Sequence, residues 1–421
     1  MPEQSYRKIT RIENVFLLAD PEDDRVPQAT IEIENGRIAY AGPARTRHSF
    51  QSKRESVQVL NAEGRTAIPG LIDLHVHLTS DLDSCLGANP PQFTPRQIAK
   101  DVLESAATLR GALRQGVTGI RDCGCPHHGV FGLRDWINEC GGQAPRLWLS
   151  GRALCATGGH AVGIGTEIDG RPSAIRAVRT ETKAGADWVK LMVTGGTATP
   201  GERPEDVQLN ASEMEAVVSE AHRRGRSVSA HCSCLEGVRS AIAAGVDTIE
   251  HGIGIDADTA ERMREADVAL IPTLACSRIE AQAGPESGIP EHTRQKAQRI
   301  YHRHRKSLAT AHETGVLLGC GTDSGPSYLP IGMASIVAEL EAMIDVGIAP
   351  GAAFASATKT AAGILGIAED LGTITVGKLA DLVIVDTDPR EEIATLLSPA
   401  AVLKGGVLVS DSQYAALQSR P

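Results

Sequence analysis

The sequence predicts an α/β fold in which a (β/α)8 TIM barrel is joined to a small β-sandwich domain. Three observations support this. Through residues 67–368, short apolar runs alternate with longer amphipathic runs, as expected for parallel strands separated by helices. Residues 1–66 and 369–421 instead hold short alternating runs between turn signals, which is typical of antiparallel strands. A chain of 421 residues is also long enough for both domains.

Both ends of the chain contribute to the predicted β-sandwich. Residues 29–42, ATIEIENGRIAYAG, alternate on both sides of Asn35-Gly36, which predicts a hairpin. Residues 57–70 add another strand. Near the other end, residues 372–389 are expected to hold two strands, and residues 401–409, AVLKGGVLV, a hairpin that turns at Gly405-Gly406. We therefore expect one domain built from residues 1–66 and 369–421.

Eight apolar segments predict the barrel strands. They are LIDLHVH (71–77), GIRDC (119–123), RLWLSG (146–151), WVKLMVT (188–194), SVSAHC (227–232), DTIEHG (247–252), VALIPT (268–273) and LLGCGTDSG (317–325). Amphipathic runs lie between them. In residues 210–225, Ser212 and Glu215 fit a capping box and Gly225 fits the end of a helix. The long connections 194–208 and 277–294 follow strands at the end of a barrel where active sites lie, so both are candidate lids.

Composition and charge exclude several partners. Aromatic content of 3% and a net charge of −10 disfavour base stacking, phosphate backbones and anionic membranes, so we expect neither a nucleic acid nor a membrane as partner. No run approaches the roughly 20 apolar residues of a membrane span, and the first 20 residues lack a signal-peptide core. Nine cysteines, an odd number in mostly apolar or glycine-rich contexts, favour reduced thiols and a cytoplasmic location. The pairs Cys123/Cys125 and Cys232/Cys234 leave a thiolate metal site as an alternative.

Histidines interrupt and close several apolar strands. His75 and His77 lie two residues apart, so in a strand their side chains point to the same side. His231 closes the fifth predicted strand, His251 the sixth and Asp323 the eighth. Taken singly, each could be a hydrogen-bonded core residue. Together they converge at the mouth of a barrel, where imidazole and carboxylate groups predict a metal site.

Lys190 interrupts the apolar fourth strand, in ADWVKLMVTGG. An unpaired charge is costly to bury at such a position. The side chain could pair with an acid or extend to solvent. Alternatively, its amine reacts with CO₂ to give a carbamate, N6-carboxylysine, an anion whose two oxygens can bridge two cations.

These residues, with PGLIDLHVH (69–77) and the tail GTITVGKLADLVIVD (372–386), resemble the amidohydrolase superfamily over nearly the whole chain. The resemblance implies a binuclear metal-dependent hydrolase with two divalent metal ions, most suitably Zn²⁺. It assigns one metal to His75, His77 and Asp323 and the second to His231 and His251, and it makes carboxylated Lys190 the bridge between them.

The resemblance also implies a mechanism. Two nearby cations acidify a shared water, which attacks the substrate carbonyl. Asp323 takes the proton from that water and delivers it to the leaving nitrogen. His160, in CATGGHAVG after the third strand, hydrogen-bonds the developing oxyanion, although it could equally be a loop histidine on the rim.

Within the superfamily, SGRALCATGGHA, GADWVKLMVTGG and GVDTIEHG are similar to the imidazolonepropionase-like and prolidase-like branch. This resemblance implies cleavage of a peptide-like amide, with release of a C-terminal amino acid from dipeptides or N-acyl amino acids. The alternatives are a xenobiotic amide of the ochratoxin type, a carbamate or a urea, and a cyclic amide. Many peptidase members carry Tyr two residues after the strand-five histidine, where this chain has Ser233, so a donor to the substrate carbonyl is missing.

Loops after the strands supply candidate substrate contacts. Arg152 could bind a substrate carboxylate through two hydrogen bonds, or form a structural salt bridge instead. His127 and His128 are expected on the pocket wall or its rim, and Asp122 behind the metal ligands. The resemblance also implies a homo-oligomer, with an octamer as one form, that acts on a small-molecule amide substrate.

Two other hypotheses are disfavoured. A deaminase of the same fold typically uses one metal, lacks the strand-four lysine and carries a Glu close after the strand-five histidine. Here Lys190 is present, and the nearest Glu, Glu236, lies five residues beyond His231. A catalytically inactive scaffold usually loses ligands, and none of the expected ligands is missing.

Overall fold

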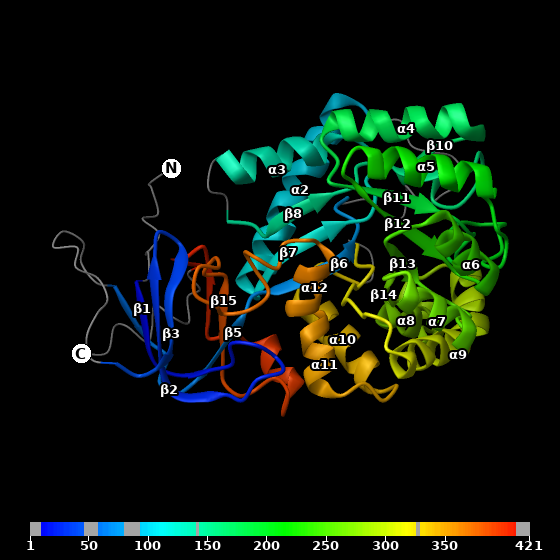
Figure 1. Ribbon diagram of the computed structural model, residues 1–421. Helices are drawn as coiled ribbons and strands as arrows, with labels where there is room; N and C mark the ends of the chain where they lie inside the picture. Colours follow the sequence, from blue (N-terminus) through cyan, green and yellow to red (C-terminus); the bar gives the residue numbers. More distant parts are fainter. Residues whose placement is uncertain (1–9, 46–57, 80–92, 140–142, 326–328, 410–421) are drawn as a thin grey trace.

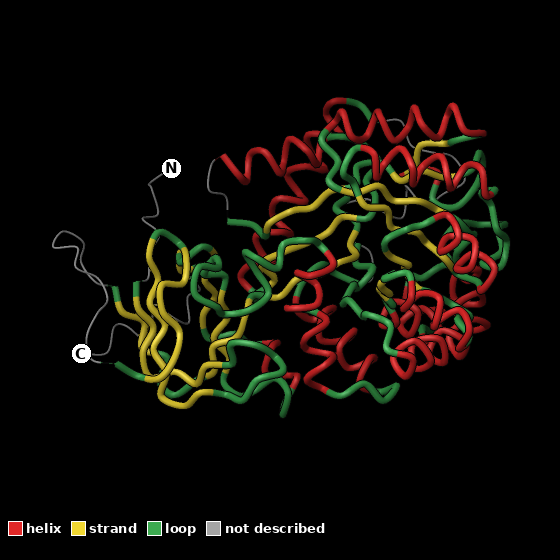
Figure 2. Tube along the Cα trace, viewed as in Figure 1, coloured by secondary structure: helices red, strands yellow, loops and turns green. Residues whose placement is uncertain are grey.

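The molecule has two parts, a β-sheet at one end and a larger body of parallel strands covered by helices (Figures 1 and 2). The computed structural model describes residues 10–45, 58–79, 93–139, 143–325 and 329–409. In Figure 1 the first strands, in blue, and the last strands, in red, lie in the same sheet.

The β-sheet has eight strands in the order β17-β16-β15-β5-β1-β2-β3, with β4 paired to β1. The strands are β1 (Arg11–Leu17), β2 (Val26–Glu34), β3 (Arg37–Pro43), β4 (Val59–Asn61), β5 (Thr66–Pro69), β15 (Leu382–Val385), β16 (Ala401–Lys404) and β17 (Val407–Leu408). The two predicted hairpins are confirmed: Asn35-Gly36 joins β2 to β3, and Gly405-Gly406 joins β16 to β17. The described strands form one connected sheet with its own buried apolar cluster. Its layering as a sandwich stays a prediction.

One predicted strand of this region is wrong. Residues 372–376, GTITV, form no strand, although Ile374 is buried and its N–H donates to the Ala19 carbonyl at 2.8 Å. Gly372 and Gly377 have φ of +90° and +94°, so the chain bends at both ends of the run and cannot continue a ladder.

Parallel strands form the centre of the larger part. One sheet has the order β6-β7-β8 and the other β10-β9-β11-β12-β13-β14. Their bounds are β6 (Leu71–Val76), β7 (Val117–Asp122), β8 (Arg146–Leu149), β9 (Ala153–Cys155), β10 (Gly165–Glu167), β11 (Trp188–Met192), β12 (Ser227–Cys232), β13 (Thr248–His251) and β14 (Ala269–Ile271). Each predicted barrel strand except the last therefore contains a strand of the structure.

The predicted eighth strand is present only as an irregular segment between β14 and β6. The Gly319 N–H donates to the Leu270 carbonyl of β14 at 2.9 Å, and the Leu74 N–H of β6 donates to the Cys320 carbonyl at 2.9 Å. Residues 317–325 therefore connect the two parallel sheets through isolated bridges, and the prediction of a regular strand there is wrong.

Helices cover the parallel strands (Figure 1). They are α2 (Pro95–Arg114), α3 (Gly129–Glu139), α4 (Gly170–Ala184), α5 (Ala211–Arg223), α6 (Leu235–Ala244), α7 (Ala257–Glu265), α8 (Leu274–Gln282), α9 (Glu291–Thr314), α10 (Met333–Ile344), α11 (Pro350–Ser356) and α12 (Lys359–Ile364), with 3-10 turns η1 (Val162–Ile164), η2 (Pro285–Ser287) and η3 (Ile393–Leu397). The capping box of α5 uses Asn210 and Glu213, so the prediction of Ser212 and Glu215 is wrong, because the helix begins two residues earlier than that pair requires. Within the described part of the chain, no helix is long and apolar enough to span a membrane.

Candidate active site

One pocket collects the predicted metal ligands. It holds about 710 Å³ of empty space, its open mouth included, and its lining contains His75, His77, Lys190, His231, His251 and Asp323. These six side chains come from β6 and the residue after it, β11, β12, β13 and the segment between β14 and β6. Residues from distant parts of the sequence therefore meet at one place, as the strand-end pattern predicts.

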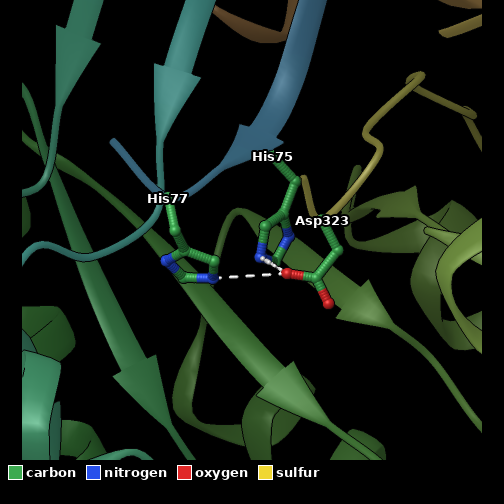
Figure 3. A group of neighbouring side chains, drawn as sticks. All are labelled: His75, His77 and Asp323. Atoms are coloured by element: carbon green, nitrogen blue, oxygen red, sulfur yellow. Dashed lines mark ion pairs between the residues drawn. The ribbon is translucent and has the colours of Figure 1, made fainter. Parts of the chain in front are cut away.

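Asp323 lies between the first two histidines. Its Oδ1 is 3.3 Å from Nε2 of His75 and 3.3 Å from Nε2 of His77 (Figure 3). The other ring nitrogens are held from behind: Nδ1 of His75 is 2.7 Å from Glu250, and Nδ1 of His77 donates to the Gly124 carbonyl at 2.9 Å. Because ligand atoms of the three side chains lie within 4.8 Å of one another, they can bind one cation together.

His231 and His251 form a second group, with ring centroids 4.5 Å apart. Nδ1 of His251 is 2.6 Å from Thr273 Oγ1, and Nε2 of His231 is 3.1 Å from the Gly195 carbonyl. Each ring therefore keeps one nitrogen that these contacts do not occupy. His251 lies 5.3 Å from His75, centroid to centroid, so the two groups are adjacent.

Lys190 is fully buried in the same lining, and its Nζ has no hydrogen-bond partner among the described residues. A buried, unpartnered ammonium is costly. A carbamate formed on this amine would instead be an anion, whose charge cations held by the neighbouring imidazoles would balance. The donor set of four imidazoles, one carboxylate and this amine therefore fits a binuclear metal site.

Charge and burial adjust the ionisation of these groups. Burial lowers the pKa of His231 well below its usual range, and His160 and Lys190 lower it further. Burial and His231 lower the pKa of His251 in the same way. Both rings are therefore neutral, the form that coordinates metals. Burial raises the pKa of Asp323, but His75 and His77 outweigh it, so this carboxylate stays ionised.

The sequence-based reasoning missed Glu250, which holds His75 in place. Arg121 and Thr248 each donate to Glu250 Oε1 at 2.7 Å, and Arg121 and Glu250 are completely buried. Burial raises the pKa of Glu250, but Arg121 and His75 outweigh it and hold the pKa well below the usual range. A signal existed: Arg121 and Glu250 are opposite charges that interrupt two apolar strands, just as Lys190 interrupts a third.

Two of the predicted metal ligands have an uncommon backbone conformation. His251 has φ of +66° and Asp323 has φ of +55°, in the left-handed region that residues other than glycine rarely adopt. Thr273, the partner of His251, has φ of +52° and is β-branched, which makes this conformation more costly still. The chain therefore leaves the strand direction at these residues, and strain of this kind is typical of functional sites.

His160 joins the pocket to the candidate lid at residues 194–208. Its ring stacks on His231 at 4.3 Å between centroids, and its Nδ1 is 2.5 Å from Glu202 in that connection. Burial raises the pKa of Glu202, but the bond and charge of His160 outweigh it and lower the pKa. A Cβ at Gly196 would lie 2.4 Å from the His160 ring, so only glycine lets the connection approach this closely.

Arg152 does not line the pocket. Its guanidinium donates to the carbonyls of Pro126 and Gly165, and its Nε donates to Thr166 Oγ1 at 3.2 Å. These hydrogen bonds hold neighbouring loops together, and the expectation that Arg152 binds a substrate carboxylate stays a prediction.

His127, His128 and Asp122 also lie outside the lining. His127 Nε2 is 3.0 Å from Asp101, and His128 Nε2 is 2.8 Å from Glu181, so both rings are engaged away from the pocket. Their contact with substrate, on the pocket wall or its rim, therefore stays a prediction. Asp122 accepts the N–H of Leu78 at 2.9 Å and that of Gly124 at 3.3 Å, which fixes the carbonyl that holds His77.

The rest of the lining is mixed in polarity. It consists of Ala161, Ile164, Met192, Thr197, Ala198, Ser233, Ile253, Cys276, Ser277, Glu280 and Ile300, together with His160. Ser233 stands where related peptidases carry Tyr, and its Oγ is 3.1 Å from His231 Nε2. The second candidate lid, residues 277–294, supplies Ser277 and Glu280, and much of it is helical.

Comparison with known proteins now assigns the family. Residues 66–409 match the amidohydrolase family. The chain belongs to this family. It is 28% identical to ochratoxinase of Aspergillus niger over 93% of this chain and 85% of that protein, and the crystal structure of that enzyme covers 95% of both chains with a TM-score of 0.79. A solved Xaa-Pro dipeptidase with bound methionine in its active site is 28% identical, with a TM-score of 0.82 over 94% of this chain and 98% of that one.

Imidazolonepropionase of Acidiphilium cryptum is 23% identical over 90% of this chain and 93% of that protein. The chain therefore lies in the imidazolonepropionase-like and prolidase-like branch of the family. It is a hydrolase that acts on amide C–N bonds. The solved relatives imply a (β/α)8 barrel with a β-rich domain for this amidohydrolase as well.

Proposed function

We propose that this amidohydrolase is a binuclear metal-dependent amide hydrolase. Its two divalent cations, Zn²⁺ by the chemistry of the donors, would be held by His75, His77, His231, His251, Asp323 and N6-carboxylysine at Lys190. The observation that carries the proposal is the Lys190 amine, which is buried among these groups and has no hydrogen-bond partner in the described part of the chain. A closed (β/α)8 barrel, completed by residues 317–325 between β14 and β6, is part of this proposal.

The residues of the pocket divide the reaction between them. When bound, the two cations acidify a shared water and polarise the substrate carbonyl. Asp323, whose carboxylate is ionised, accepts the proton from that water and passes it to the leaving nitrogen. His160, whose Nδ1 lies 2.5 Å from Glu202, hydrogen-bonds the oxygen on which charge develops.

The proposed substrate is a peptide-like small-molecule amide, cleaved to release a C-terminal amino acid. Two similar proteins support this choice. One is named a dipeptidase and holds an amino acid, methionine, in its active site. The other is named for ochratoxin.

A second candidate substrate is a neutral amide, carbamate or urea without a free carboxylate. One observation favours it. The described lining contains no Arg, and its one Lys is Lys190, so a substrate carboxylate has no guanidinium or free ammonium to bind. N-acetyl amino acids and their carboxamides, compared as substrates, separate the two candidates: the peptidase hypothesis requires faster hydrolysis of the free acids.

The direct test of the metal centre is the Lys190→Ala variant. We expect about two metal ions per chain in the wild-type protein, with occupancy that rises with bicarbonate. The variant should lose metal and at least about 100-fold in kcat/KM, since it lacks the bridging group. Lys100→Ala, an exposed lysine on α2, is the matched control. A Lys190→Ala protein with full metal content and full activity would contradict the proposal.

A homo-oligomer, such as an octamer, and a cytoplasmic location are also proposed. Reduced cysteines support the second point, since the described cysteines form no disulfide with one another. Light scattering of the purified protein measures the first.

A further inference from the structure

Helix α8 forms one wall of the pocket, and it adds the carboxylate of Glu280 to that of Asp323, which comes from another segment. Cys276, Ser277 and Glu280 all line the pocket, and Glu280 is only 3% exposed. Cys276 and Glu280 are four residues apart, so they share one face of the helix. The reaction described above uses none of these side chains.

Cys276 relates the position of Glu280 to the metal ligands. Burial raises the pKa of the Cys276 thiol, the charges of Glu280 and Asp323 raise it further, and so does a hydrogen bond to Asp323, which makes Cys276 the place where α8 meets Asp323. One helical turn advances about 5.4 Å along the axis. Glu280 therefore stands about one turn from the place where α8 meets Asp323, which corresponds to several covalent bonds along a bound substrate.

The charge of the lining favours a cation at that distance. Apart from the imidazoles, the ionisable acids and amines of the described lining are Asp323, Glu280 and Lys190. Carboxylation of Lys190 would also replace its positive charge by a negative one. Glu280 therefore attracts a cationic substrate group that lies away from the two proposed cations, whose own positive charge repels such a group near the metal site.

Lys296 offers a competing, purely structural role for Glu280. Burial lowers the pKa of Lys296, while Glu202 and Glu280 raise it, so Glu280 helps to keep this buried amine charged. The amine itself donates to the carbonyls of Thr199 at 2.6 Å and Gly196 at 3.3 Å. Lys296 therefore binds the backbone of the 194–208 connection, and it is not among the residues that line the pocket. An experiment must separate support of Lys296 from contact with substrate.

We propose that Glu280 is a specificity-determining residue that binds a cationic group of the substrate, an ammonium or guanidinium several bonds from the amide that is cleaved. The inference rests on the proposed amide hydrolysis and names its substrate class: amides of basic amino acids or of other amine-bearing acids. Glu280 supplies the carboxylate, and Ser277 on the preceding turn supplies a hydroxyl within the same lining.

Two matched substrate pairs test this proposal. Nα-acetyl-lysine and N-acetyl-norleucine place the amine, or its absence, on the leaving-group side, and 6-aminohexanoyl anilide and hexanoyl anilide place it on the acyl side. For at least one pair, wild-type protein should show at least about a tenfold higher kcat/KM for the cationic member, since a charge-assisted hydrogen bond contributes on this scale. Glu280→Gln should reduce that ratio at least about tenfold, and Glu280→Asp should restore part of it.

Controls separate the possible outcomes. Glu286→Gln, an exposed residue shortly after α8, should keep the wild-type ratio. If Glu280 acts only through Lys296, Glu280→Gln and Lys296→Met will slow both members of each pair equally, and the inference is overturned. Equal rates within both pairs for wild-type protein also overturn it while leaving amide hydrolysis intact. Failure of the metal-loaded wild-type protein to hydrolyse any of the four amides rejects the proposed function itself, and this inference with it.

Discussion

The two sides of the pocket are built in different ways. The ligand side is made of the six predicted metal ligands. Five of them lie on strands or directly after one, and Asp323 lies in the irregular segment between β14 and β6. The imidazoles are fixed by Glu250, Thr273 and the carbonyls of Gly124 and Gly195. The wall side consists of α8, α9 and residues 194–208. Lys296 and His292 of α9 tie this connection in place by donating to its backbone carbonyls.

This difference gives catalysis to the ligand side and the choice of substrate to the wall side. Side chains braced by partners on neighbouring strands can hold cations and move protons at fixed positions. A wall of helices and loops can change its side chains without disturbing those positions, as is common at the loop end of barrels. Substitutions on the ligand side should therefore lower metal affinity and the free energy of unfolding. Substitutions on the wall side should change the kinetics with substrate.

The largest effect is expected for Glu250→Gln on the ligand side. The change leaves the Arg121 guanidinium buried without its counter-ion and weakens the hold on His75, so stability should fall by about 3–5 kcal/mol. Metal affinity should fall about 10–100-fold. Chelator titration and urea denaturation measure both effects. Glu215→Gln, an exposed residue of α5, is the control, and unchanged metal affinity in Glu250→Gln would show that the brace is unnecessary.

Lys296→Met, on the wall side, should change the KM for substrate but not the metal content. The variant loses the hydrogen bonds to Thr199 and Gly196, a loss on the order of 1–3 kcal/mol in the anchoring of residues 194–208. We expect a higher KM and faster cleavage within this connection by a glutamate-specific protease, with unchanged metal content. Lys306→Met, exposed on the same helix, is the control. A loss of metal in Lys296→Met would contradict the hypothesis that the wall side does not contribute to metal binding.

The third effect is a pH dependence that comes from Glu339. This buried residue of α10 accepts the N–H groups of Leu274 and Ala275, the first two residues of α8. Burial raises its pKa from 4.5 to about 7; Asp73 adds to the rise and Arg278 opposes it. The folded protein therefore binds this proton more tightly than the unfolded chain does. The resulting stabilisation is complete below pH 4.5 and is lost as the pH rises through about 7.

Glu339→Gln removes this dependence. The difference in free energy of unfolding, wild type minus variant, should fall by roughly 1.4 kcal/mol per pH unit within that window. Urea denaturation at several pH values measures it, and Glu341→Gln, exposed on the same helix, should show a constant difference. A constant difference for Glu339→Gln would mean that its proton is not held in the folded protein.

The ligand side could be predicted because its residues violate a pattern. His75, Lys190 and His231 stand in strands that are otherwise apolar, so the sequence itself marks them as unusual. Arg121 and Glu250 carried the same mark and were missed, because only the fold shows that their two strands place them in contact.

The wall could not be predicted in this way. Glu280 and Lys296 occur in amphipathic helices, where charged residues normally face solvent, so nothing in the sequence indicates that both are buried. For Arg152 the sequence left a substrate contact and a structural role open, and only the fold shows that the carbonyls of Pro126 and Gly165 accept hydrogen bonds from its guanidinium.

Tight packing explains why the eighth predicted strand is irregular. A Cβ at Gly321 would lie 2.3 Å from Ile271 and 2.8 Å from His75 Cβ, so the segment can lie here only because this residue has no side chain. An apolar run with glycines is typical of a buried strand, and the sequence could not show that neighbours on both sides would restrict it to isolated bridges.

Gly70 alone separates β5 from β6, the strand that carries His75. β5 pairs with β1 on one side and with β15, residues 382–385, on the other. During synthesis, β5 therefore cannot pair with β15 until more than 300 further residues have been made. Full anchoring of the first ligand strand is for this reason a late event in biosynthesis, and a nascent chain that stalls before β15 carries the histidines without the scaffold that holds them.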